Sequence, residues 1–177
     1  MFLSSATSLR CAWIFIIIFL LAGCTPEEYG ETNLSGHIEQ VENIESYLAT
    51  HIGISGFGGK VFCAYEALKA KQDEGGMMYV WAMCLEYYLE QDELTLGSGV
   101  SVPVVLQTNQ IHDHYEIVGH VTPREGNFYG EDVRASFPQS AWPQIMPESE
   151  GEIDAYNSRA ERLAQAIEEK ARAHFGD

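Results

Sequence analysis

Three histidines and a glutamate in the second half of the chain have the residue types and the spacing of a metal site. The set consists of His112, His114, Glu116 and His120. Even spacing would place their side chains on one face of a β-strand. Imidazole and carboxylate groups bind zinc, copper and nickel. The alternative is a solvated strand face that happens to carry histidines, so the pattern gives one metal-site hypothesis.

Two glycine-rich segments resemble catalytic motifs in part, but neither has the full pattern. Residues 56–60 read GFGGK, but a phosphate-binding loop needs a further glycine where Ile54 stands and a Ser or Thr where Val61 stands. Residues 97–101 read GSGVS and lack the Gly-x-Ser-x-Gly spacing of a nucleophile elbow. The sequence therefore predicts no catalytic residue and no cofactor.

The first 24 residues have the pattern of an export signal. Arg10 precedes an apolar run, residues 11–22, which is shorter than the roughly 20 residues of a membrane-spanning helix. Leu21-Ala22-Gly23-Cys24 follows, and this segment resembles the lipobox of bacterial lipoproteins. The resemblance implies a signal peptide over 1–23, removed on export, and diacylglycerol on Cys24 with palmitate-like acyl chains. An uncleaved signal anchor is the alternative.

The expected domain organisation follows from this signal. Residues 24–36 comprise the lipidated cysteine and a polar, Gly- and Pro-containing tether, and residues 37–177 form one domain. Thr25 is not the aspartate that marks inner-membrane retention in some lipoproteins. We therefore expect an extracytoplasmic protein, periplasmic or on the cell surface, anchored to the cell membrane or outer membrane.

Two of the four cysteines belong to the expected signal peptide and lipidation site, which leaves Cys63 and Cys84. They fall on the two arms of an expected hairpin. A turn centred between residues 73 and 74 places them directly opposite each other, and a turn over residues 73–76 offsets them by two positions. Export to an oxidising compartment favours a disulfide. The alternative is two buried free thiols.

The remaining pattern predicts an α+β fold. Apolar residues at helical spacing indicate a helix over 37–52, with Ser35 as its N-cap. Alternating residues predict two β-hairpins, 61–90 and 99–122, with Pro103 at an edge or a bulge. A helical turn over 131–137 and a loop over 138–148 precede a final helix, for which Ser149 and Glu152 have capping-box spacing. An antiparallel four-stranded sheet packed with the two helices in two layers is the simplest arrangement.

The charge balance bears on partners. The chain has 26 acidic and 10 basic residues, a net charge of −16. This charge argues against nucleic acid, whose phosphates would be repelled. It is compatible with a cationic partner, a metal ion or simple solubility.

The leading functional hypothesis is a non-enzymatic, lipid-anchored domain that binds or supports another envelope protein. A metal-binding protein or metal-dependent enzyme that uses the His112, His114, Glu116 and His120 face is one alternative. The element order is similar to that of cystatin-like folds, and this analogy implies a third option, an inhibitor of an envelope hydrolase. Aromatic residues in 123–130 suggest a candidate interface there.

Overall fold

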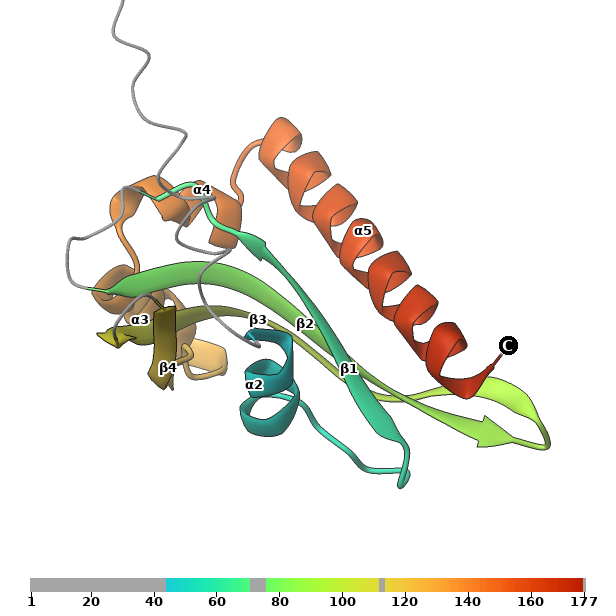
Figure 1. Ribbon diagram of the computed structural model, residues 1–177. Coiled ribbons are helices and arrows are strands. Elements are labelled where there is room, and N and C mark those ends of the chain that lie inside the picture. The colour runs from blue at the N-terminus through green and yellow to red at the C-terminus, as the bar shows by residue number, and fades with distance from the viewer. Residues whose placement is uncertain (1–43, 71–75, 112–113, 177) are drawn as a thin grey trace, which may run out of the picture. The chain divides into compact units, whose positions relative to one another are not determined.

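The computed structural model describes residues 44–70, 76–111 and 114–176. All of them belong to the compact unit Glu31–Asp177. In Figure 1 a short helix precedes the strands of the sheet, and a helical segment that ends in a long helix follows them. In chain order the elements are α2 (Ile44–His51), β1 (Lys60–Ala67), β2 (Met77–Glu90), β3 (Glu93–Ile111), β4 (His114–Val121), η1 (Gly126–Phe128), α3 (Tyr129–Ser136), η2 (Gln139–Ala141), α4 (Trp142–Ile145) and α5 (Glu150–Phe175).

Several sequence predictions fall outside the described residues. These are the export signal over 1–23, the tether over 24–36, and the first part of the helix expected over 37–52, with its cap at Ser35. The part of that helix that is described, α2, ends at His51, and the N–H of Gly53 donates to the carbonyl of Leu48, as expected of a helix stop there.

The four strands form one antiparallel sheet in the order β1-β2-β3-β4, which confirms the α+β class. A third hairpin, β2–β3, joins the two that the sequence predicts. Its turn residues Gln91 and Asp92 have φ values of 53° and 65°, the left-handed region that two-residue hairpin turns require. Gln-Asp lacks the usual glycine of such a turn. As a result, β3 begins at Glu93 and not at Gly99, the start that the residue alternation predicts.

Pro103 lies where β3 has a strand neighbour on one side only. It pairs with Trp81 of β2, whereas the pairing of β3 with β4 begins at Val105. A proline cannot donate a backbone hydrogen bond, so this local edge suits it. The edge position, one of the two that the sequence allows for Pro103, is confirmed.

Both faces of the sheet are covered. On β2, every side chain from Met78 to Cys84 is buried, and successive residues belong alternately to two apolar clusters. One cluster joins the sheet to α3, α4 and α5, and the other joins it to α2. Figure 1 shows α2 and α5 on opposite sides of the strands. The two helices therefore enclose the sheet from both faces, whereas the simplest arrangement from the sequence had two layers.

Lys170 links the two helical layers around the free edge of β1. Its ammonium group forms an ion pair with Glu45 of α2 at 2.5 Å and donates to the carbonyl of Cys63 at 2.9 Å. A lysine on an edge strand's open side hinders pairing with another chain. This contact protects the edge of β1.

The C-terminal segment departs from the sequence prediction at one point. The turn expected over 131–137 is present as α3, but residues 138–148, expected as loop, contain η2 and α4. α4 is a single turn with a proline in its first positions, too short for a periodic signal. α5 begins with the predicted capping box of Ser149 and Glu152. Among the described residues, we find no helix with the length and apolar character needed to cross a membrane.

Candidate ligand-binding site

The residues of the predicted metal site do not share one face of β4. The regular register of β3 and β4 breaks between Gln107 and Thr108, and Val118 of β4 is left without an opposing residue. Such a bulge shifts the alternation of side chains by one position. His120 therefore lies on the face covered by α2, whereas Glu116 belongs to the opposite face.

His120 contacts α2 instead. Its Nδ1 lies 3.0 Å from the hydroxyl of Tyr47, and the ring of His51 stacks on that tyrosine at 4.1 Å. Burial, followed by the nearby His51 imidazole, lowers the pKa of His120. Within the described residues no group of three or more His, Cys, Asp or Glu side chains could hold a metal ion. His112 and the side chain of His114 lie outside the described part.

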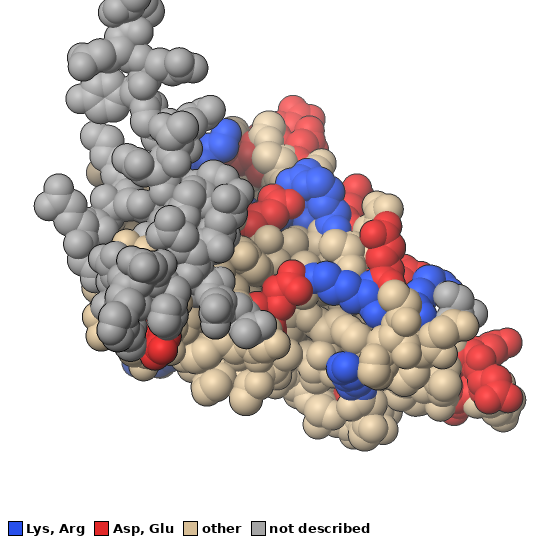
Figure 2. Space-filling view, in the orientation of Figure 1, with Lys and Arg blue, Asp and Glu red and all other residues tan. Residues whose placement is uncertain are grey.

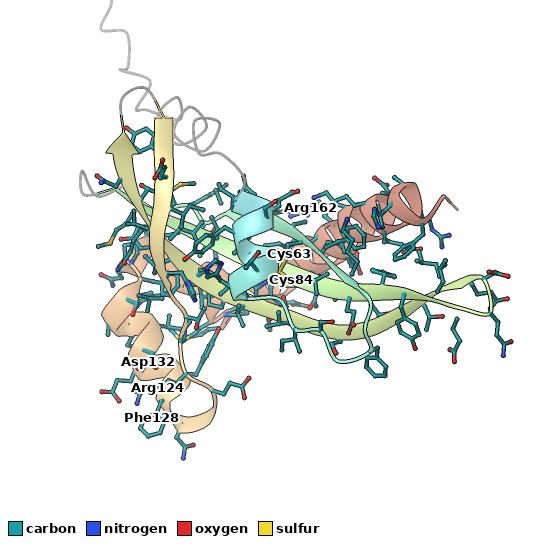
Figure 3. All side chains as sticks on the ribbon, turned by 60° about the horizontal axis from the view of Figure 1, so that its bottom comes forward. Cys63, Cys84, Arg124, Phe128, Asp132 and Arg162 are labelled. Atoms are coloured by element: carbon teal, nitrogen blue, oxygen red, sulfur yellow. A yellow bond between two sulfur atoms is a disulfide. The ribbon has the colours of Figure 1, made fainter. Side chains whose placement is uncertain are left out.

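Cys63 and Cys84 form a disulfide, as predicted. They are opposite residues of β1 and β2, one of the two registers that the sequence allows. The expected turn itself lies in residues 71–75, outside the described part of the chain. Figure 3 shows the bond beneath α2, and the two residues are only 3% and 1% exposed. The disulfide cross-links the hairpin, and because it is buried in the apolar core its sulfur atoms are not accessible for thiol chemistry.

The glycine-rich loop before β1 binds an anion that belongs to the chain itself. The carboxylate of Glu86 is fully buried and accepts hydrogen bonds at 2.7 to 3.2 Å from five groups: the Ser55 hydroxyl and the backbone N–H groups of Gly56, Phe57, Gly59 and Ser98. Burial opposes ionisation, but these bonds outweigh it and hold the pKa of Glu86 well below its ordinary value. The loop's donors are therefore already occupied.

The candidate interface at 123–130 is fixed by an ion pair. Arg124 forms a two-pronged ion pair with Asp132 of α3 at 2.7 and 2.8 Å, and its guanidinium lies 4.2 Å from the ring centre of Phe128. Figure 3 shows the three side chains together. These hydrogen bonds lower the pKa of Asp132 to about 2. Phe128 remains 51% exposed.

A pocket of about 330 Å³ opens between the end of β1, α4 and the first half of α5. Gln144 of α4 holds these elements together, because its side-chain amide bonds to both the N–H and the carbonyl of Lys69 after β1. Its backbone carbonyl accepts a hydrogen bond from Arg159 of α5 at 2.7 Å. The pocket walls are thus connected through one residue.

Arg159 is the unusual residue of this pocket. It is 6% exposed, and its guanidinium lies 4.4 Å from the ring centre of Trp81 and 5.3 Å from that of Tyr156. Burial lowers the pKa of Arg159, although the nearby Glu66 carboxylate opposes this shift. Its Nε is buried and has no hydrogen-bond partner among the described residues. Because Arg159 is a buried cation whose Nε lacks a hydrogen-bond acceptor among the described residues, we take this pocket as the candidate site.

No family model, curated protein or solved structure matches this chain.

Arg159 is not among the candidate site residues that the sequence predicts. In the last helix, Tyr156, Ala160 and Leu163 recur at helical spacing, and the buried Arg159 lies on the same stripe. A single charged residue on the buried stripe of an amphipathic helix is the signal that would have identified it.

Proposed function

We propose that this protein is a lipid-anchored, extracytoplasmic binding protein without enzymatic activity, which takes its ligand in the pocket beside Arg159. The observation that carries the binding role is a nearly fully buried guanidinium that lines a pocket and lacks a partner for its Nε among the described residues. Burial of the Arg159 guanidinium costs desolvation free energy, and a ligand that accepts a hydrogen bond from Nε offsets part of this cost.

Two features support the proposed location. Leu21-Ala22-Gly23-Cys24 resembles a lipobox, and the Cys63–Cys84 disulfide is compatible with an oxidising compartment outside the cytoplasm. Acyl chains on Cys24 would anchor the protein firmly, since each buried methylene contributes about 0.8 kcal/mol.

The anchor is tested by replacing each cysteine of the N-terminal segment in turn. In a bacterial host fed labelled palmitate, the wild type and the control Cys11→Ser should incorporate label and sediment with membranes. Cys24→Ser should lose the label and either leave the membrane fraction or accumulate as the longer precursor. If Cys24→Ser keeps the label and the mature size, the lipoprotein proposal is wrong.

The binding role is tested separately on the full-length lipoprotein in detergent. A panel of small organic acids, amines and neutral molecules is screened by the shift that each compound causes in the thermal unfolding midpoint. Compounds that bind the pocket should stabilise the wild type and the control Arg172→Gln, a substitution on the same helix outside the pocket, but not Arg159→Met. No stabilising compound, or equal stabilisation of all three proteins, would overturn the binding role.

A further inference from the structure

The guanidinium of Arg159 has more donors than acceptors around it. An arginine side chain carries five N–H donors, and among the described residues Arg159 makes one hydrogen bond, from Nη2 to the Gln144 carbonyl. The guanidinium also lies against the aromatic faces of Trp81 and Tyr156, and such faces offer no lone pair in the plane of the guanidinium.

The two carboxylates of the pocket are engaged elsewhere. Glu66 accepts two hydrogen bonds from Arg162, each 2.9 Å long. Glu152 accepts from the backbone N–H groups of Glu148 and Ser149, at 2.9 Å each, in the capping box of α5. Neither carboxylate forms a hydrogen bond with Arg159, so no described acidic side chain fills its remaining donor positions.

The pocket is locally rich in cations although the whole chain carries a net charge of −16. Its charged lining consists of Lys69, Arg159, Arg162, Glu66 and Glu152. Figure 2 shows the basic side chains of this face interspersed with acidic ones. A single negative charge would balance the lining. A doubly charged phosphate would exceed the net charge of +1 on the lining and leave an uncompensated negative charge in the pocket.

Apart from Gln144, the uncharged lining residues contribute mainly apolar surface. Tyr156, Ala67, Ala155 and Pro143 contribute carbon surface, and a volume of about 330 Å³ lies near the lower end of the range for small-molecule sites. Such walls fit the short apolar body of a ligand. The planar fork of an arginine matches the two oxygens of a carboxylate.

We infer that the pocket binds the carboxylate of a small organic acid with a short apolar body, held by Arg159. The inference rests on the proposed function, because it names the ligand class of that same pocket. The acid can be a free small molecule or the C-terminal carboxylate of a short peptide, since both present the same group.

The test compares acids with their matched amides on the full-length lipoprotein in detergent. Benzoate is paired with benzamide for a free acid, and N-acetyl-alanyl-alanine with its C-terminal amide for a peptide end. Calorimetry gives the affinities, and the Nε–H resonance of Arg159 in ¹⁵N spectra reports contact directly. At least one acid should bind about tenfold or more tightly than its amide and shift that resonance, since charge-assisted hydrogen bonds have this size of effect.

Two variants leave the buried Arg159 unchanged and therefore test the site without altering the core. Arg162→Gln replaces a side chain that is 59% exposed and releases Glu66, which can then compete for Arg159, so the affinity for acid should fall about tenfold. Arg172→Gln should bind as the wild type does. Amides that bind as tightly as acids, or an unchanged affinity in Arg162→Gln, would overturn the carboxylate assignment and leave the binding role standing. Absence of any binding would overturn both.

Discussion

The Cys63–Cys84 disulfide should contribute about 3 kcal/mol to the free energy of unfolding. The two cysteines are 21 residues apart, and closing a loop of that length in the unfolded chain removes entropy worth about 3 kcal/mol at 25 °C. Stabilities of 5 to 15 kcal/mol are typical of single domains. One cross-link therefore accounts for a large share of the expected stability.

The perturbation is the double variant Cys63→Ala/Cys84→Ala. Because both side chains are buried, the variant loses sulfur packing in the apolar core as well as the cross-link. Wild-type protein with the bond chemically reduced keeps both sulfur atoms and serves as the matched control. The loss common to the two samples is the contribution of the bond, and the difference between them is the contribution of packing.

Urea unfolding in detergent with linear extrapolation measures both losses. The thermal midpoint should fall by about 6 to 12 °C for a domain of this size. Alkylation under denaturing, non-reducing conditions should find Cys63 and Cys84 blocked in the untreated wild type. Free reactivity of both thiols, or a loss below about 1 kcal/mol in the reduced wild type, would refute the reasoning.

Three further predictions follow from single sites. The pKa of Glu86 in the folded protein lies below its ordinary value of 4.5. The ionised carboxylate therefore stabilises the fold at pH values above 4.5, and this stabilisation is lost progressively as the pH falls below 4.5 toward the pKa of the folded state. Urea midpoints measured down to about pH 3 should therefore fall more steeply in the wild type and in Glu90→Gln, an exposed control, than in Glu86→Gln. Gly59→Ala would place a Cβ against the backbone carbonyl of β2 and should destabilise the protein by about 1 to 3 kcal/mol in urea. Gly151→Ala, where a Cβ has open space, should not destabilise it. Protein purified without a histidine tag should hold less than one zinc or copper ion per chain by elemental analysis, and a full equivalent lost in His114→Ala/His120→Ala would support a metal role instead.

The sequence is sufficient to predict a structural feature that depends on one local interaction. The capping box of Ser149 and Glu152 depends only on residues three apart, so its spacing can be read from the sequence. Antiparallel register fixes the partner of Cys63 once the turn is fixed, and the observed pairing with Cys84 is one of the two registers that the sequence allows.

The sequence was insufficient where the backbone departs from regular geometry or where distant elements meet. A bulge at Val118 separates Glu116 from His120, and strict alternation cannot anticipate an inserted residue. The Gln91-Asp92 turn lacks the glycine that usually announces it. The pocket depends on contacts between Arg159, Gln144 and Trp81, which come from three separate elements.

Arg159 also allows a structural role to be separated from a binding role. Replacing it with methionine removes one hydrogen bond to Gln144 and the stacking on Trp81, but it also relieves the desolvation of a charge and of an Nε that lacks a partner among the described residues. Apolar replacement of buried charges is often neutral or stabilising. We therefore expect the free energy of unfolding of Arg159→Met to stay within about 1 kcal/mol of the wild type, while its affinity for acids falls about tenfold or more. If urea unfolding instead shows that Arg159→Met lowers the free energy of unfolding by more than about 3 kcal/mol, Arg159 is a structural cation. A residue whose role is ligand binding is not expected to stabilise the unliganded fold by that amount.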